Sequence, residues 1–163
     1  MKKGFYILAA LLWGIVLAGC QSTGMDVGDY SRARFLLESR NENDFAAMVT
    51  LPLSQVKIPV QGQAVLSEFD YQSIDVAEVS LGKCLAFTLK GPAAREFYQI
   101  SVANQGSRLV LAVDGDPVGA RRIKGPISDG RIFIFLELPD EQLDELAKKL
   151  QETNFDIQKR LSS

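Results

Sequence analysis

The amino-acid sequence predicts an α+β domain in which two helices pack on one face of a mainly antiparallel sheet. Short apolar or alternating segments recur along the chain with glycine, proline or aspartate between them, which is typical of strands joined by tight turns. Two other segments, which begin at Pro92 and Pro139, carry apolar residues at helical spacing instead. Strands in succession favour antiparallel pairing, with the helices covering the sheet.

The sequence of the first part of the domain, residues 33–66, predicts strands and no helix. Residues 33–38 alternate side chains and predict a first strand, followed by a loop at 41–44 and a second strand at 47–51. Residues 56–66 hold β-branched residues but also Pro59. Because proline cannot donate a ladder hydrogen bond, we expect extended edge pieces here and no central strand.

A hairpin and a helix are expected next. Residues 73–81 and 84–89 are two extended segments joined by a Gly-Lys turn, which predicts a hairpin. A helix then begins at Gly91-Pro92, since proline suits the first helical position, and Gly106 is placed to cap its end.

The last part of the chain predicts further strands before a second helix. Residues 108–113 are almost wholly apolar and predict a central strand, a turn at 114–117 leads into a return strand at 118–123, and residues 132–138 predict one more strand. The helix that follows Pro139 has an acidic first turn, which suits the helix dipole. Its apolar stripe consists of Leu143, Leu146, Ala147 and Leu150.

Residues 1–19 have the layout of a secretory signal peptide. Lys2 and Lys3 form a basic start, and an apolar run at 5–16 follows. This run is shorter than the roughly 20 residues that a membrane-spanning helix needs, and no basic stop follows it. A permanent transmembrane helix is therefore the less favoured interpretation.

The tetrapeptide Leu17-Ala18-Gly19-Cys20 resembles the lipobox of bacterial lipoproteins. The resemblance implies that Cys20 becomes the first mature residue and carries the lipid that holds the protein on a membrane. A buried cysteine in an ordinary apolar helix is the competing interpretation. Gln21 stands where many inner-membrane lipoproteins carry aspartate, which favours the outer membrane over the inner one.

The remaining chain suits one compact domain. Residues 20–29 are expected to be the lipidated N-terminus and a flexible tether, and residues 30–163 a single α+β domain. The formal charge of −2 becomes about −4 when Lys2 and Lys3 leave with the signal peptide, which disfavours nucleic-acid binding. The chain has no histidine, so the commonest general base and zinc ligand are both missing.

We expect no cofactor, no metal and no catalytic residue. Asp114, Asp116 and Asp129 lack the acidic ladder and closing glutamate of a calcium loop, and an Asp-Gly pair suits the positive φ of a tight turn. No nucleophile, zinc or phosphate-loop motif occurs, which leaves a serine with a lysine base as the enzymatic alternative. Cys84 lies in an apolar run and is expected to be a small buried hydrophobe, without a disulfide partner once Cys20 carries lipid.

The densest basic cluster of the sequence is a candidate interaction patch, formed by Arg121, Arg122 and Lys124. Such a patch could contact acidic protein segments, lipid headgroups or peptidoglycan. A solvated strand face with Asp116 and Asp129 as charge partners is the competing interpretation.

The C-terminal half of the domain resembles the first periplasmic (head) domain of SecD, a protein-export subunit. The order of an apolar strand, an Ala- and Phe-rich helix, an Asn-x-Gly turn, a strand ending in Asp-Gly, a Pro-Ile-x-x-Gly turn and a Leu-Ala-x-x-Leu helix carries the resemblance. The matching turn residues include Asp114, Gly115, Pro126 and Gly130. The resemblance implies a SecD-like head that contacts extended or unfolded polypeptide. SecD continues into membrane helices that use proton flow, and this part is not carried over, because the sequence ends at Ser163.

Together these patterns predict a lipid-anchored, non-catalytic interaction module that faces the periplasm. Its expected partner is an envelope protein or an unfolded exported polypeptide, in protein export or envelope assembly. The alternative is a structural envelope lipoprotein that binds cell-wall glycan or stabilises a neighbouring complex.

Overall fold

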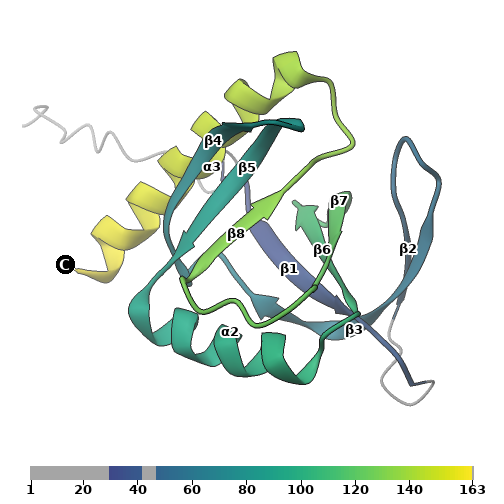
Figure 1. The fold of residues 1–163 in the computed structure, drawn as a ribbon. Helices are drawn as coiled ribbons and strands as arrows, with labels where there is room; N and C mark the ends of the chain where they lie inside the picture. Colours follow the sequence, from purple (N-terminus) through teal and green to yellow (C-terminus); the bar gives the residue numbers. More distant parts are fainter. Residues whose placement is uncertain (1–29, 42–46, 163) are drawn as a thin grey trace, which may run out of the picture.

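The computed structural model describes residues 30–41 and 47–162 (Figure 1). Within these residues the chain forms two helices and eight strands. In chain order they are β1 (Ala33–Glu38), β2 (Ala47–Thr50), β3 (Lys57–Leu66), β4 (Tyr71–Val79), β5 (Gly82–Leu89), α2 (Gly91–Ala103), β6 (Arg108–Val113), β7 (Asp116–Arg122), β8 (Arg131–Ile134) and α3 (Asp140–Leu161).

The strands divide between two antiparallel sheets, a division that the periodicity of the sequence does not reveal. The larger sheet has the order β2-β3-β1-β6-β7, and the smaller one has the order β4-β5-β8. The predicted α+β class is therefore confirmed, as is the predicted hairpin, in which β4 pairs with β5. The chain turns back after Val79 through Gly82, which has a φ of 118°.

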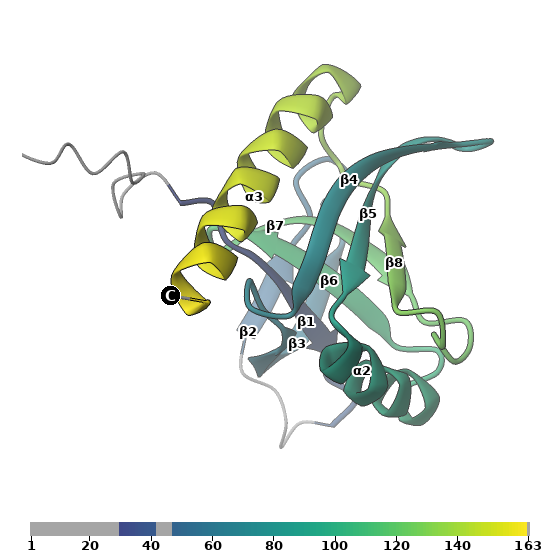
Figure 2. The same ribbon diagram turned by 90° about the vertical axis from the view of Figure 1, so that its left-hand side faces the viewer.

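The main core lies between the inner faces of the two sheets (Figure 2). The predicted alternation of β1 places Phe35 inward, where it is fully buried. Its ring meets the ring of Phe87 from β5 edge-on, with the centroids 5.0 Å apart, and the ring of Tyr71 from β4 at 6.3 Å. These three rings join the two sheets.

The two helices close the sides of this core (Figure 1). Helix α2 has proline in its first turn, as predicted, and buries Ala93 and Phe97 against the core. Helix α3 lies along β4 and buries the predicted residues Leu143, Ala147 and Leu150. Beyond the predicted apolar stripe, α3 continues to Leu161. No helix among the described residues combines the length and the apolar character needed to span a bilayer.

The free edge of β4 is covered by amide side chains of α3. The backbone N–H of Ile74 donates to Oε1 of Gln151 at 2.7 Å. Gln158 donates from Nε2 to the carbonyl oxygens of Tyr71 and Gln72, at 3.0 and 3.3 Å. These contacts satisfy backbone groups that a neighbouring strand would otherwise pair, so α3 protects this part of the sheet edge.

The prediction of edge pieces at 56–66 is wrong, because β3 is a continuous strand with a neighbour on each side. Pro59 is accommodated because its carbonyl accepts a hydrogen bond from the N–H of Ser39 at 2.9 Å. The backbone of Pro59 therefore faces the end of the β1–β3 pairing, where the register shifts before Glu38. Because the pairing is irregular there, the N–H that proline lacks removes no regular hydrogen bond of the ladder.

The strand expected at 132–138 is shorter in the structure, since β8 ends at Ile134. The next residues leave β8 and approach β7, where the N–H of Glu137 donates to the carbonyl of Val118 at 2.7 Å. Gly119 permits this approach, because a Cβ at that position would lie 2.5 Å from the carbonyl oxygen of Phe135. The β7 side of the large sheet is thereby joined to the chain that follows the small sheet.

Candidate functional site

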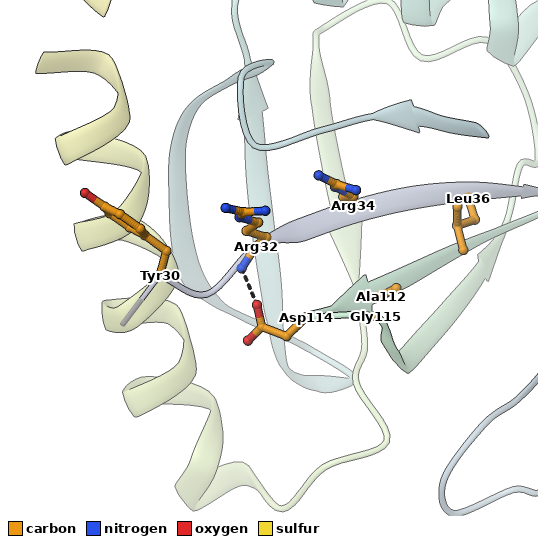
Figure 3. Close-up of a pocket in the computed structure, with 7 residues that line it drawn as sticks. All are labelled: Tyr30, Arg32, Arg34, Leu36, Ala112, Asp114 and Gly115. Atoms are coloured by element: carbon orange, nitrogen blue, oxygen red, sulfur yellow. Dashed lines mark hydrogen bonds between the residues drawn. The ribbon is translucent and has the colours of Figure 1, made fainter. Parts of the chain in front are cut away.

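A groove of about 470 Å³ lies on the outer face of the large sheet, over the start of β1 and the end of β6 (Figure 3). Its position follows from the alternation of β1, in which the residues between the core positions point outward. In register, Arg34 lies opposite Ala112 of β6, so a small side chain stands beside a long one and leaves space. The lining residues are Tyr30, Arg32, Arg34, Leu36, Ala112, Asp114 and Gly115.

Two arginines of the groove share one buried carboxylate. Arg34 donates from Nε and Nη2 to the two carboxylate oxygens of Glu68, both at 3.0 Å. Arg32 places its Nε 3.8 Å from the same carboxylate. The Glu68 side chain is 7% exposed, whereas those of Arg32 and Arg34 are 51% and 50% exposed. The positive groups are therefore on the surface and the negative group lies beneath them.

The two-point hydrogen bonding fixes the ionisation of this pair. Burial acts to raise the pKa of Glu68, but the hydrogen bonds and positive charge of Arg34, with the charge of Arg32, outweigh it and hold the pKa below the usual 4.5. The same hydrogen bond raises the pKa of Arg34. Glu68 is thus ionised at neutral pH, and the Arg34 guanidinium is held in one orientation.

Tyr30 forms the rim of the groove nearest to α3. Its hydroxyl donates a hydrogen bond to the carboxylate of Asp156, and this bond lowers the pKa of Asp156. The guanidinium of Arg160 lies over the Tyr30 ring, 5.5 Å from its centroid, and Arg160 also pairs with Asp156 at 3.0 Å. The beginning of the described chain is thereby tied to the last turns of α3.

Asp114 and Gly115 close the end of the groove at the turn between β6 and β7. Both have positive φ, 53° and 98°, as the Asp-Gly pair predicted for a tight hairpin. Asp114 accepts the N–H of Arg32 on Oδ1 at 2.7 Å and returns its own N–H to the carbonyl of Arg32 at 2.9 Å. This exchange fixes the entry of β1 against β6.

The basic cluster of the sequence does not form one surface. Arg121 pairs in register with the core residue Leu109, and its half-buried guanidinium donates to the carbonyl of Phe133 at 2.8 Å. Burial lowers the pKa of Arg121. Arg122 points to the opposite face of β7 and donates to the carbonyl of Gly106 at 2.6 Å, while Lys124 is exposed.

The other two turn residues singled out from the sequence support α2. Pro126 precedes Ile127, whose N–H donates to the buried hydroxyl of Ser101 at 2.9 Å. Gly130 has a φ of 65°, and a Cβ there would come within 3.0 Å of the Cβ of Ala94. These positions serve packing and turn geometry. The lipobox residues Leu17, Ala18, Gly19 and Cys20 lie outside the described residues.

The arginine groove was not predicted from the sequence. The available signal was the placement of Arg32 and Arg34 two residues apart on a strand whose other face is apolar, which puts both on one exposed face. Their partner Glu68 lies 34 residues beyond Arg34 and could not be assigned without the fold. Cys84 is fully buried, as predicted, and the described part of the chain holds no cluster of three metal-ligating acidic, histidine or cysteine side chains.

A second exposed surface lies on the small sheet. Phe133 of β8 stands in register with Ala86 of β5 and points away from the core, and it is 36% exposed. Phe135, just beyond β8, is 40% exposed, and Leu81 at the tip of the β4–β5 hairpin is 83% exposed. Exposed apolar side chains that form a contiguous patch are typical of surfaces that contact other macromolecules, which makes these three residues a candidate contact surface.

The fold is thus a small two-sheet α+β domain with an arginine-containing groove on the large sheet and exposed apolar residues on the small sheet. Solved structures of SecDF have a similar fold. The chain superposes on SecDF in its super-membrane-facing form with a TM-score of 0.60 and 18% identity. The TM-score is 0.57 with 16% identity for a structure of the membrane component SecDF that enhances protein export, and 0.52 with 18% identity for SecDF, a translocon-associated membrane protein from Thermus thermophilus.

These matches establish the shared fold of a part of SecDF. They cover 74%, 78% and 77% of this chain but only 18%, 63% and 20% of the SecDF chains. No protein-family model and no curated protein matches the sequence. The fold predicted from the SecD resemblance is therefore confirmed, and the match is to the domain and not to the whole export protein.

Proposed function

We propose that this protein is a lipid-anchored, non-catalytic domain that binds polypeptide or an envelope protein in the service of protein export or envelope assembly. The observation that carries the proposal is the fold shared with SecDF, a membrane component that enhances protein export. The resemblance noted in the sequence and the structural likeness are to the same protein. The comparison with SecDF shows a shared fold, and the role in protein export or envelope assembly is our proposal.

The apolar surface of the small sheet is the proposed partner site. Unfolded polypeptide exposes apolar side chains and free backbone groups, and it is captured by surfaces that offer apolar contacts outside a closed core. Phe133, Phe135 and the hairpin tip at Leu81 provide such contacts. Arg131 lies two residues before Phe133 and is exposed beside it, which adds a charged rim to the apolar surface.

The anchor is proposed to be a lipid on Cys20. The lipobox pattern supports it, and one acyl chain alone would bind a membrane only marginally, whereas two or three hold it stably. Gln21 favours the outer membrane. The test is metabolic labelling with radioactive palmitate. We expect the label on the wild-type protein and none on the Cys20→Ala variant, and equal labelling of both would contradict the anchor.

Capture from solubilised cell envelope tests the partner. Wild-type protein should recover a protein that a variant with Leu81→Ser and Phe133→Ser does not recover. The matched control is Phe155→Ser, because Phe155 is also apolar and is 68% exposed, but belongs to α3 and not to the strands of the small sheet. Recovery that is unchanged by the paired substitution, or that is lost equally with Phe155→Ser, would contradict the proposed surface. Recovery of nothing above a Cys20→Ala control would count against the function itself.

Cell-wall glycan is a second candidate ligand, favoured by the exposure of Arg122 and Lys124 near the end of β7. Sedimentation with purified peptidoglycan tests it. Glycan binding would replace the first proposal if two results are obtained together. The wild-type protein should sediment with peptidoglycan and the variant with Arg122→Glu and Lys124→Glu should not, and the capture experiment should recover no envelope protein. Arg121 is left unchanged in this test because its guanidinium joins the two sheets.

A further inference from the structure

The end of the domain where the described chain begins presents cationic groups to solvent. The side chains of Arg32, Arg34 and Arg160 are 51%, 50% and 54% exposed. Their carboxylate partners Glu68 and Asp156 are only 7% and 22% exposed. The domain is acidic in sum, with 20 acidic against 18 basic residues in the whole chain. At this end the three guanidinium groups are therefore more exposed than the carboxylates that they pair with.

The groove between these arginines suits a phosphate group. Arg34 uses Nε and Nη2 on Glu68, and a guanidinium has further N–H donors that bind phosphate oxygens well. Arg32 holds only a 3.8 Å contact with Glu68, so its guanidinium is free to turn toward a ligand. Asp114 is the acidic residue of the lining, and its Oδ1 is taken by the N–H of Arg32.

Two aromatic side chains stand at the same end. Phe69 is 52% exposed and directly follows Glu68, the shared partner of the two arginines, in the turn after β3. Tyr30 lines the groove. Aromatic rings next to arginines are typical of surfaces that rest in the headgroup region of a bilayer, where one side of the contact is apolar and the other is wet.

The position of the surface in the chain points to a membrane. Residues 21–29 separate Cys20 from Tyr30. About ten extended residues reach roughly 35 Å at most, which is about the diameter of a small domain. A lipid on Cys20 would therefore keep the groove close to the bilayer, so that contact with headgroups becomes an encounter within one assembly and needs little intrinsic affinity.

We propose that the groove and its rim, formed by Tyr30, Arg32, Arg34, Phe69 and Arg160, dock on anionic phospholipid headgroups. The docking orients the domain so that the apolar surface of the small sheet faces away from the anchor. It deepens the proposed function and rests on the proposed anchoring at Cys20. A headgroup phosphate enters the groove between the arginines, and Phe69 enters the interfacial layer.

Tryptophan fluorescence tests the docking, since Trp13 is the single tryptophan of the chain. In a Trp13→Phe background, Phe69→Trp places a reporter at the surface and Tyr98→Trp places a control on α2, where Tyr98 is 38% exposed. The full chain is purified from membranes and reconstituted in vesicles of brominated phosphatidylcholine, with or without brominated phosphatidylglycerol. Thermal unfolding confirms that each variant is folded.

The reporter at position 69 should be quenched and blue-shifted in the anionic vesicles, and much less so in phosphatidylcholine alone. Arg32→Gln with Arg160→Gln should reduce the docked-to-free ratio about fivefold for each arginine removed. These substitutions leave the Arg34–Glu68 pair intact. The matched control, Arg122→Gln with Lys124→Gln, removes the same charge elsewhere and should have little effect. High salt should release the reporter, because the screening length falls from about 10 Å at 0.1 M to about 3 Å at 1 M.

Equal quenching with both lipids, equal quenching of the position 98 reporter, or equal loss in both charge variants would overturn the docking. The docking would also be overturned if the position 69 reporter is not quenched and the Arg32 and Arg160 variant no longer captures protein. The arginines would then be assigned to the binding of a protein partner. The palmitate label separates the two proposals. Label on Cys20 without quenching leaves the anchor standing and removes the docking, whereas absence of label on Cys20 removes the anchor and the docking that rests on it.

Discussion

Arg34 and Glu68 form a two-point ion pair that links the first strand to the turn after β3. Both donor–acceptor distances are 3.0 Å, and the carboxylate is almost completely buried while the guanidinium is half exposed. The pair closes one side of the main core and shapes the groove on the outside. The stability of the domain and the geometry of the groove therefore both depend on the contact between Arg34 and Glu68.

Arg34→Met should destabilise the domain by about 1–3 kcal/mol, because it leaves the buried carboxylate of Glu68 without its main partner. The half exposure of Arg34 keeps the cost below that of a fully buried pair. Urea unfolding at pH 7 measures it. The double variant Arg34→Met with Glu68→Gln should recover most of the loss, and a double variant as unstable as the single one would contradict this account.

The same pair predicts a dependence of stability on pH. The pKa of Glu68 is lower in the folded protein than its usual 4.5, so the stability that it contributes is present above 4.5 and is lost as the pH falls through the folded-state pKa. Other carboxylates with lowered pKa values add to the total effect, so the comparison is with Glu68→Gln. The difference in urea midpoint between wild type and this variant should shrink between pH 5 and about pH 3. A constant difference would show that the carboxylate charge does not stabilise the fold.

Gly119→Ala should destabilise the domain by about 1–3 kcal/mol, since the added Cβ would lie 2.5 Å from the carbonyl oxygen of Phe135 and the backbone would have to move. Gly125→Ala is the matched control, because a Cβ there meets nothing within 4 Å. Thermal unfolding of the two variants compares them directly. Equal melting temperatures would mean that the contact between β7 and the chain after β8 is not tight.

Gln151→Ala should expose the N–H of Ile74 at the edge of β4, because the glutamine oxygen is its partner at 2.7 Å. Hydrogen exchange at this amide should speed up by at least tenfold, which corresponds to about 1.4 kcal/mol of lost protection. Gln142→Ala, on the exposed side of the same helix, is the control and should leave this amide unchanged. Unchanged exchange in both variants would show that α3 does not guard the edge.

Cys84 should react with iodoacetamide only after unfolding, because the thiol is fully buried and burial raises its pKa. Labelling followed by mass spectrometry of the peptide that contains Cys84 measures this with and without denaturant. The Cys20→Ser variant leaves Cys84 as the single thiol of the chain and provides the control. Rapid labelling of the native protein would contradict its position in the small sheet.

Much of the fold could be predicted from local patterns. The alternation in β1, the β4–β5 hairpin and the proline start of α2 are encoded within a few residues each. The continuity of β3 could not be predicted in this way, because it depends on which side of Pro59 faces β1. The second half of α3 was not anticipated either, since its buried face carries Thr153 and Asn154, whose partners lie far away in the sequence.

The candidate site could be predicted only in part. The Asp114–Gly115 turn was expected from its residue types, and the structure places it at the end of the groove. The arginine pair was missed, because its meaning depends on Glu68, which the fold brings beneath it. Arg121 and Arg122 are adjacent in sequence but point to opposite faces of one strand, so charge density along the chain does not translate into a surface patch.

Photo-crosslinking in living cells tests the central claim most directly. Probes at Leu81, Tyr98 and Arg131 sample the exposed surfaces near the small sheet and α2, and a probe at Lys148, 77% exposed on α3, is the control. We expect probes at Leu81 and Arg131 to capture translocon subunits or many secreted chains, and the control probe to capture neither. Capture of nothing above the control, or of a single envelope protein unrelated to export, would contradict the export function. The fold would then serve a different function in this protein.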